Sequence, residues 1–419
     1  MHRIIIEGGK KLTGEIKISG SKNSAVALVP AAILCDEEVT IANVPNISDI
    51  TALDKILNHL GAKVTKHADV MKIDASNIEN KLVPEDIAKK LRASYYFMGA
   101  LLGRFKKVEI YFPGGCSIGA RPINLHIKGF KALGAKVAEK NNLFTITADK
   151  LIGNKINLDF ASVGATINLM LAAVKAEGTT IITNAAKEPH IVNVATFLNN
   201  MGAKITGAGT SEIKIEGVKY LHSCFHEVVP DYIETGTYMI LASAIGDKIT
   251  IKNIIPDHVE SLISKLEEAG VPMEIGVDLI NISAPSVINP VNIKTQVYPG
   301  FPTDLQQPMA TLLTQANGKS IINETIWENR FLNLIELNKM GATTTEITNS
   351  KAVILGPSKL KGKRVCATDL RAGASLVIAG LIADGTTIID NADYILRGYE
   401  NIVEKLKNVG AKIELLEIE

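Results

Sequence analysis

The sequence predicts an α/β protein that is built from six copies of one unit and folds as two domains of three units each. The 419 residues exceed the size of an ordinary single domain. Two short phrases recur along the whole chain, one containing a glycine and the other rich in β-branched residues. Self-similarity at a nearly fixed period indicates a repeated supersecondary unit. Hydrophobic residues make up 46% of the chain and charged residues 21%, which is typical of globular proteins.

The glycine phrase reads Leu-Gly-Ala-Lys-Val in its clearest copies, at residues 60–64 and 133–137. A left-handed glycine commonly ends a helix, so each copy is expected to terminate one. The six glycines, spaced by 68 to 73 residues, are Gly61, Gly134, Gly202, Gly270, Gly341 and Gly410.

The β-branched phrase precedes each glycine and predicts a strand that leads into a helix, as 250–253 leads into 259–269. Further strands, such as 136–139 and 143–147, and a second helix, such as 165–176, follow. The six copies of the phrase are residues 40–43, 107–110, 180–184, 250–253, 320–323 and 387–391. Pro230 interrupts the pattern near the middle, which places the division between the two halves there.

The balance of charges makes nucleic acid an unexpected partner, because 45 basic and 44 acidic residues leave a net charge of +1 without a basic block. None of the four cysteines lies within metal-ligand spacing of another, so neither a metal nor a cofactor is expected. The longest apolar run, 25–35, is too short to cross a bilayer. Sparse cysteines and no evident signal peptide favour the cytoplasm. The oligomeric state stays open.

Arginine is scarce in this chain, which makes its positions informative. Only eight of the 45 basic residues are arginines. An arginine fork binds a carboxylate or phosphate through two parallel hydrogen bonds, which lysine cannot do. Arg3 and Arg364 are expected to be ordinary surface residues, whereas arginines near helix starts are candidates for anion binding.

A thiol lies within a glycine-rich segment at residues 113–122, which reads PGGCSIGARP. The glycines allow close approach of the backbone to a ligand. Fixed positive charge, here Arg121, lowers the pKa of a nearby thiol such as Cys116. The segment therefore predicts a loop that carries a reactive group next to an anion.

Polar residues gather where a strand or loop leads into a predicted helix, a place that favours anions. A strongly anionic substrate, or two phosphate-bearing ligands, would suit this arrangement. For single residues a simpler role stays open: Ser21, Asn23 and Asp304 could be helix caps, Asp369 could pair with Arg371, and His126 could be an ordinary polar residue on a helix. The positions are 19–23, 92–94, 121–122, 162–164, 302–304, 369–371 and 397–398.

Taken together, these segments resemble the UDP-N-acetylglucosamine 1-carboxyvinyltransferase family, the enolpyruvyl transferases of the first committed step of peptidoglycan synthesis. The resemblance runs from residues 5–8 to 397–399. It implies an inside-out α/β barrel in two domains, each built from three βαβαββ units. One domain would contain residues 1–20 and 230–419, and the other residues 21–229 with the Cys116 loop.

The resemblance also implies a reaction: the enolpyruvyl group of phosphoenolpyruvate moves to the 3′-hydroxyl of UDP-N-acetylglucosamine, and phosphate leaves. Cys116 would donate a proton to the methylene carbon, could form a covalent adduct and would be the target of fosfomycin. Asp304 would take the proton of the sugar hydroxyl. The anionic groups of phosphoenolpyruvate would be held by Lys22, Arg121 and Arg397, with Arg92 and Arg371 nearby.

The same resemblance assigns the remaining substrate contacts. Asn23 would contact the sugar and the tetrahedral intermediate, and Arg330 would lie at the domain interface near the sugar. The other implied contacts are Pro122, Ile123, Asn124, Leu125, Ser162, Val163, Gly164, Ile326 and Asp369. Asn124, His190 and Tyr232 depart from the residues common in this family, and the last two are expected to affect pairing between domains more than chemistry.

Two other functions stay open at this stage. The shikimate-pathway enolpyruvyl transferase shares the fold and chemistry but lacks the cysteine loop. A non-catalytic sensor of nucleotide sugars would keep the fold without needing Cys116, Asp304, Lys22 and Arg397 together.

Overall fold

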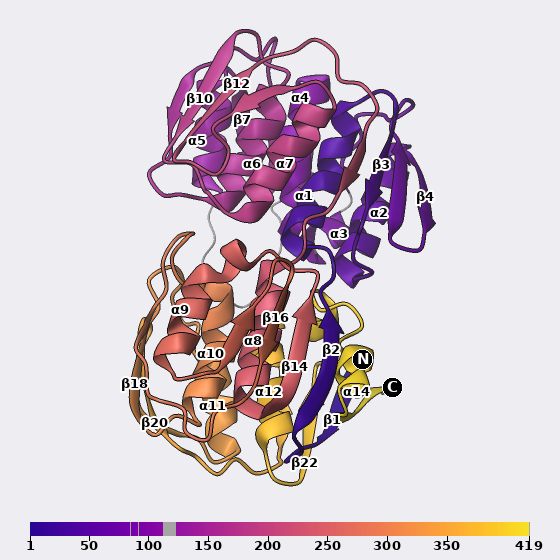
Figure 1. The fold of residues 1–419 in the computed structure, drawn as a ribbon. Helices are drawn as coiled ribbons and strands as arrows, with labels where there is room; N and C mark the ends of the chain where they lie inside the picture. The colour runs from indigo at the N-terminus through magenta and orange to yellow at the C-terminus, as the bar shows by residue number, and fades with distance from the viewer. Residues whose placement is uncertain (84, 91, 112–122, 419) are drawn as a thin grey trace. The chain divides into compact units, whose positions relative to one another are not determined.

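The structure is a computed structural model that describes residues 1–83, 85–90, 92–111 and 123–418. These residues divide into two compact units. We call residues 1–19 with 230–418 the C-terminal unit, and the described residues of 20–229 the N-terminal unit (Figure 1). Cys116, Arg121 and Pro122 lie outside the described residues.

The described part of the N-terminal unit contains three sheets, with strand orders β13-β3-β5-β4, β6-β8-β7 and β9-β10-β12-β11. In the second sheet, a bridge from Val83 to Ile110 takes the place of the outer parallel strand. The strands are β3 (Glu38–Ala42), β4 (Lys63–His67), β5 (Val70–Asp74), β6 (Lys107–Tyr111), β7 (Lys136–Lys140), β8 (Leu143–Thr147), β9 (Lys155–Asn157), β10 (Thr179–Thr183), β11 (Lys204–Thr206), β12 (Glu212–Glu216) and β13 (Phe225–Glu227).

The sheets of the C-terminal unit repeat this order, as β2-β14-β16-β15, β17-β18-β20-β19 and β21-β22-β1-β23 in the described residues. The strands are β1 (His2–Glu7), β2 (Leu12–Lys17), β14 (Gly246–Lys252), β15 (Met273–Ile275), β16 (Leu279–Ile282), β17 (Ile293–Lys294), β18 (Gly318–Asn323), β19 (Thr343–Ile347), β20 (Lys351–Gly356), β21 (Arg364–Cys366), β22 (Thr386–Asp390) and β23 (Lys412–Glu417).

All six sheets share one plan, which confirms the six repeats predicted from the sequence. A central strand, formed by the β-branched phrase, pairs antiparallel with a following hairpin in five of the sheets, as β10 does, and with β1 beside β23 in the sixth. An outer strand pairs in parallel with the central one, as β9 does with β10, except where the Val83 bridge replaces it. Distant segments complete several sheets: β1 lies between β22 and β23, β2 pairs with β14, and β13 pairs with β3.

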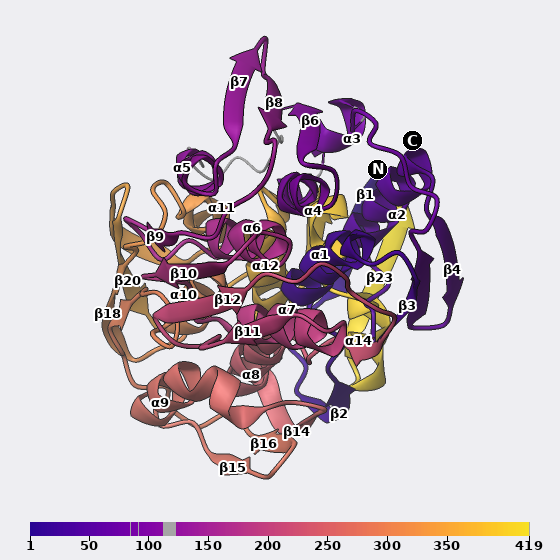
Figure 2. The ribbon, with the colours of Figure 1, turned by 90° about the horizontal axis from the view of Figure 1, so that it is seen from above.

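Three helices in each unit are buried on nearly every side, with the sheets outside them (Figures 1 and 2). A helix that is apolar all round must lie inside a protein, which explains the apolar runs in the sequence. The buried helices are α1 (Lys22–Ala31), α4 (Tyr96–Phe105) and α6 (Val163–Ala173) in one unit, and α8 (Tyr232–Ile245), α10 (Gln306–Leu313) and α12 (Leu370–Ile382) in the other.

The remaining helices are mostly amphipathic, with apolar residues at helical spacing on one face. In α9, for example, Leu262, Ile263 and Leu266 are buried while the other face is exposed or half-buried. Among the described residues, no helix is long and apolar enough to cross a membrane. The helices are α2 (Ser48–Leu60), α3 (Glu85–Lys90), α5 (Asn124–Ala132), α7 (Pro189–Asn200), α9 (Glu260–Glu268), α11 (Leu332–Lys339), α13 (Asp393–Leu396) and α14 (Ile402–Asn408).

The six phrase glycines all adopt positive φ, between 82° and 106°, at the ends of helices. The prediction of helix ends is therefore confirmed. Helix starts differ more: α1 begins at Lys22 rather than 24, and α6 at Val163 rather than 165. In both cases a serine caps the helix one residue before it begins, so the first turn includes the polar residues.

The buried helices α4 and α6 approach each other through glycines. A Cβ atom at Gly99 would lie 2.4 Å from the carbonyl oxygen of Asn168, and one at Gly103 would lie 2.8 Å from that of Leu171. The N–H of Gly99 also donates to Oδ1 of Asn168 at 2.8 Å. Glycine is therefore required by the close backbone approach rather than by helix propensity.

We expect Gly99→Ala to lower the free energy of unfolding by about 2 kcal/mol, because overpacking against rigid backbone outweighs the better helix propensity of alanine. Urea unfolding followed by circular dichroism measures the change. The exposed position Glu267 on α9 provides a control, since Glu267→Ala should change the stability by less than about 0.5 kcal/mol. Equal stability of Gly99→Ala and wild type would contradict the packing argument.

Candidate active site

Polar side chains cap the N-termini of four of the buried helices, α1, α6, α8 and α12. Ser21 accepts a hydrogen bond from the N–H of Ser24 at 3.3 Å, and Ser162 accepts one from Ala165 at 3.3 Å. Asp231 and Asp369 each accept two, at 2.8 to 3.0 Å. The caps satisfy N–H groups that would otherwise be buried without partners. The simpler role left open for Ser21 is thus confirmed.

The Asp304 carboxylate lies between two arginines of the C-terminal unit. Nη2 of Arg330 donates to Oδ1 of Asp304 at 2.8 Å, and Nε and Nη2 of Arg371 donate to Oδ2 at 3.2 and 3.0 Å. Both arginines are nearly fully buried, whereas the side chain of Asp304 is 29% exposed. The carboxylate therefore keeps one solvent-accessible side, while the two buried guanidinium groups hold its oxygens in place.

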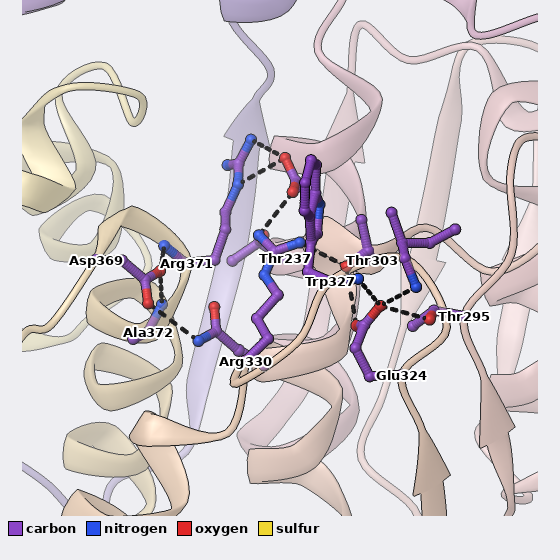
Figure 3. Close-up of polar contacts among 12 residues, drawn as sticks. Thr237, Thr295, Thr303, Glu324, Trp327, Arg330, Asp369, Arg371 and Ala372 are labelled. Atoms are coloured by element: carbon purple, nitrogen blue, oxygen red, sulfur yellow. Dashed lines mark hydrogen bonds and ion pairs between the residues drawn. The ribbon is translucent and has the colours of Figure 1, made fainter. Parts of the chain in front are cut away.

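Asp304 belongs to the short 3₁₀ helix η4 (Thr303–Leu305), directly before α10. Arg330 comes from the loop after β18, and Arg371 from the first turn of α12. The sequence analysis proposed all three as site residues, and the structure brings them together (Figure 3).

Arg371 is fixed by a second set of contacts. Its guanidinium lies 5.3 Å from the ring centroid of Tyr399, whose hydroxyl is 2.8 Å from Oγ1 of Thr237. Burial acts to lower the pKa of Arg371, but the neighbouring Tyr399 and Asp304 more than compensate and raise it above its usual value. Arg371 therefore remains charged in its buried position.

Asp369 has a structural role in this cluster. Its Oδ1 accepts the backbone N–H groups of Arg371 and Ala372 at 2.9 Å, and its Oδ2 accepts from Nε2 of Gln307 at 3.2 Å. The pairing with Arg371 left open by the sequence thus occurs through the backbone, while the guanidinium of Arg371 binds Asp304.

In the N-terminal unit, Lys22 begins α1, and its Nζ pairs with Oδ2 of Asp49 at 3.0 Å. The lysine side chain is 16% exposed and that of Asp49 is 6% exposed. Asp49 therefore orients a cation at the first turn of a buried helix. Asn23 lies on the same turn and is half-buried.

Three other segments of this unit meet at Gly164. A Cβ atom there would lie 2.8 Å from Oη of Tyr95 and 3.0 Å from Cε1 of His126. His126 is a buried residue of α5 whose Nδ1 lies 3.0 Å from Nδ2 of Asn168, so it is more than a polar residue on a helix surface. The structure thus brings the 162–164 turn next to α5 and the 3₁₀ helix η2 (Arg92–Tyr95).

The other nucleotide-site candidates of this unit can be placed only in part. Ile123 is buried before α5, Asn124 begins that helix, and Leu125 packs partly against the core. Arg92 begins η2, but its side chain lies outside the described part of the structure. Val163 begins α6 and is half-buried.

Arg397 does not open a helix, contrary to the sequence prediction. It follows the last residue of the short helix α13, and α14 begins only at Ile402, after Asn401 in the left-handed conformation. The intervening turn separates the two helices. Arg397 lines a small open pocket with Asn391, Asp393 and Tyr394.

Glu324 is a residue that the sequence analysis missed. Its side chain is buried and accepts hydrogen bonds from the hydroxyl groups of Thr295 and Thr303 at 2.8 and 2.9 Å. It also accepts the backbone N–H groups of Ile326 and Trp327 at 2.9 and 3.2 Å (Figure 3). The carboxylate thus orders the segment that carries Ile326, one of the proposed nucleotide contacts.

The described cysteines are poorly suited to nucleophilic chemistry. Burial raises the pKa of Cys35, Cys366 and Cys224, the last to about 11. At neutral pH these thiols therefore stay protonated, and a thiol reacts far more slowly than a thiolate. Among the described residues, no group of three or more His, Cys, Asp or Glu side chains could hold a metal ion.

Two of the departures from family residues are buried at helix starts. His190 is the second residue of α7, and Tyr232 is the first residue of α8. The ring of Tyr232 meets that of Tyr298 edge-on, with centroids 6.0 Å apart. Their expected effect on pairing between domains stays a prediction.

Comparisons with known proteins agree over nearly the whole chain. Residues 6–406 match the family model of EPSP synthase (3-phosphoshikimate 1-carboxyvinyltransferase). The UDP-N-acetylglucosamine 1-carboxyvinyltransferase 2 of Bacillus cereus is 54% identical over 414 residues, which cover 99% of this chain and 96% of that protein. The protein of the same name from Listeria monocytogenes is 54% identical over 411 residues, which cover 98% and 97% of the two chains.

Solved structures show the same fold. The enolpyruvyl transferase NikO from Streptomyces tendae matches with a TM-score of 0.90 at 26% identity, covering 100% of this chain and 99% of NikO. The EPSP synthase of Acinetobacter baumannii, at 16% identity, matches over the full length of both chains with a TM-score of 0.77. The inside-out α/β barrel expected from the sequence is therefore confirmed, and the chain belongs to the EPSP synthase family of 1-carboxyvinyl (enolpyruvyl) transferases.

Proposed function

We propose that this chain transfers the enolpyruvyl group of phosphoenolpyruvate to the 3′-hydroxyl of UDP-N-acetylglucosamine and releases phosphate, the first committed step of peptidoglycan synthesis. The observation that carries the proposal is the 54% identity, over 99% of the chain, to a protein named for this transfer. The oriented carboxylate of Asp304 supports it, because the reaction needs an acceptor for a hydroxyl proton.

In this proposal Asp304 is the base. Two arginines on its oxygens favour the ionised form and weaken it as a base. A weak base suffices here, because protonation of the enol ether carbon creates an oxocarbenium-like centre. The sugar hydroxyl becomes acidic as its oxygen bonds to that centre, so its proton moves late and to a group already in place.

Cys116 would supply the proton to the methylene carbon and could also form the covalent adduct with phosphoenolpyruvate. The tetrahedral intermediate then loses phosphate and one proton of the new methyl group, which yields the enol ether product. Lys22, Arg121 and Arg397, with Arg92 and Arg371 nearby, would hold the phosphate and carboxylate groups throughout. Fixed cations stabilise the charge that develops on the departing phosphate.

The acceptor would be bound by residues at the starts of helices and in the segment ordered by Glu324. Asn23 and Arg330 would lie by the sugar. The uridine diphosphate would contact Arg121, Pro122, Ile123, Asn124, Leu125, Ser162, Val163, Gly164 and Ile326. Asp369 would support the site through its cap on α12.

We further propose that the two units are the domains 21–229 and 1–20 with 230–419, and that the enzyme works in the cytoplasm. The pairing of β1 with β22 and β23, and of β2 with β14, supports the first point, because these partner strands all lie within 230–419. The three described cysteines, all free thiols, support the second.

Purified protein is expected to release inorganic phosphate only when phosphoenolpyruvate and UDP-N-acetylglucosamine are both present. A colorimetric phosphate assay measures this, with shikimate 3-phosphate as the control acceptor. Release with shikimate 3-phosphate instead would favour the shikimate-pathway activity. Normal binding of the nucleotide sugar without phosphate release would favour the sensor.

Fosfomycin is expected to alkylate Cys116 alone, because burial raises the pKa values of the other three thiols. Those thiols remain protonated and unreactive as the pH rises from 7 to 8. Peptide mass spectrometry after brief exposure locates the adduct. Modification confined to Cys35, Cys224 or Cys366 would count against Cys116 as the reactive group.

Asp304→Asn is expected to lower kcat by at least about 100-fold, because the amide cannot take the hydroxyl proton. It should also reduce stability by about 3 kcal/mol, since Arg330 and Arg371 lose their counter-charge. Steady-state kinetics and thermal unfolding measure the two effects. A variant that kept more than a tenth of wild-type kcat would exclude Asp304 as the base.

A further inference from the structure

We propose that Glu324 is a positioning residue that aligns Asp304 through Thr303 and Arg330, an inference that rests on the proposed role of Asp304 as the base. The evidence is a comparison among the repeats of this chain. Four of them place an asparagine where the fifth places Glu324, and that exchange reverses the direction of a hydrogen bond.

The equivalence of these positions follows from the backbone. At the end of five central strands of the described residues, the carbonyl group of one residue accepts the N–H of the residue that follows the outer parallel strand. The residue that directly follows this accepting residue in the sequence is the one that we compare among the repeats. In these bonds, at 2.9 to 3.0 Å, the N–H of the first residue donates to the carbonyl oxygen of the second: Val228 to Ala42, Leu158 to Thr183, Ile18 to Lys252, Thr295 to Asn323 and Ala367 to Asp390. The compared residues are therefore Asn43, Asn184, Asn253, Glu324 and Asn391.

The four asparagines behave alike. All adopt positive φ, between 55° and 61°. Three donate from Nδ2 to a carbonyl oxygen of the neighbouring strand at 2.8 Å, and Asn391 donates to Sγ of Cys366 at 3.1 Å. This position therefore normally locks the outer strand to the central one through a donated hydrogen bond.

The fifth repeat departs from this pattern on both sides. The donor amide is replaced by an acceptor carboxylate, and the apolar partner position (Val228, Leu158, Ile18 or Ala367) is replaced by Thr295. The Thr295 hydroxyl accepts the N–H of Thr325 at 2.8 Å, so its proton is directed to Oε1 of Glu324 at 2.8 Å. The strands remain locked together with the hydrogen bond reversed.

The exchange frees the second oxygen of Glu324 for another task. Oε1 receives Thr295 and the N–H groups of Ile326 and Trp327, whereas Oε2 receives the hydroxyl of Thr303 at 2.9 Å. A guanidinium only donates hydrogen bonds, so the Thr303 oxygen accepts from Arg330 and the Thr303 proton points toward Glu324.

That orientation fixes the next two contacts. With its proton directed to Glu324, the Thr303 oxygen presents its lone pairs to Nη1 of Arg330 at 2.6 Å. The same guanidinium then donates from Nη2 to Oδ1 of Asp304 at 2.8 Å. Glu324, Thr303, Arg330 and Asp304 thus form one directed chain of hydrogen bonds, of which Figure 3 labels the first three residues. Within the chain each donor is matched to one acceptor, and such buried networks hold their members in a single geometry.

Glu324→Gln tests this chain with a minimal change. In the variant, the three groups that donate to Oε1 keep the amide oxygen at that position. The amide NH₂ group therefore faces Thr303. The Thr303 proton then has no acceptor, and the alignment of Arg330 is lost. We expect kcat to fall by about 10- to 100-fold, with KM for phosphoenolpyruvate changed by less than about threefold, because a misplaced base impairs the chemical step rather than binding of that substrate.

Variants of the two threonines separate positioning from stability. Thr303→Val removes the relaying hydroxyl and should match Glu324→Gln, whereas Thr303→Ser keeps a hydroxyl and should recover most of the lost kcat. Thr295→Val, which leaves the Thr303 branch intact, should lower Tm and alter kcat by less than about twofold. The double variant Glu324→Gln/Thr303→Val should be no slower than either single variant, because both interrupt the same chain.

Crystal structures of wild type and Glu324→Gln provide a readout that needs no activity. The contact between Arg330 and Asp304 should be lost or displaced in the variant. If wild type released no phosphate, the proposed function would fail, and this structural comparison would still decide the positioning role. An unchanged contact, a normal kcat in Glu324→Gln, or a Thr303→Ser variant as slow as Thr303→Val would each overturn the inference.

Discussion

The burial of three helices in each unit is the constraint on which the rest of the structure depends. A helix enclosed on every side carries few polar residues along its body, and α6 and α12 are buried almost throughout. Those inside, such as Asn168 of α6, are held by hydrogen bonds to neighbouring helices. The helix N-terminus differs, because free N–H groups there need partners and attract negative charge. Polar chemistry is therefore concentrated at one end of each buried helix. Because the repeats are equivalent, these ends gather, as the contact of Arg371 in the first turn of α12 with Asp304 before α10 shows.

Function in this fold depends on local departures from the repeat. Regular copies need a strand lock such as Asn184, which joins the outer strand to the central one. In the fifth copy the lock is Glu324, which keeps the strand joined through Thr295 and gains a contact to Thr303 beside Asp304. A repeated scaffold can accept such an exchange because the hydrogen bond is reversed rather than removed, so no buried group loses its partner.

The sequence predicts the repeats well because their signals are local. Six glycines end helices at positive φ, and six β-branched phrases form central strands, as expected. It fails where geometry depends on distant residues. The phrase at 320–323 ends in an asparagine, but Asn323 is an exposed strand residue and Glu324 holds the position of the four asparagines. Arg397 was placed at a helix start because a turn and a short helix look alike in sequence. The equivalent residue is identified by the parallel pairing, in which the N–H of Thr295 donates to the carbonyl oxygen of Asn323, so that Glu324 is the next residue.

The scarcity of arginine predicted which residues could bind an anion, but it did not predict that two of them bind a carboxylate of the chain itself. Two of the eight arginines meet at one carboxylate, and a lysine in either place would present a single point charge instead of an oriented fork. Such a clamp lowers the affinity of Asp304 for a proton while fixing where a proton can arrive. For a reaction in which the hydroxyl loses its proton only as a carbon–oxygen bond forms, location matters more than basicity. The buried arginines, and the hydrogen-bond chain from Glu324 that orients one of them, thus fix the position of the Asp304 carboxylate at the expense of its strength as a base.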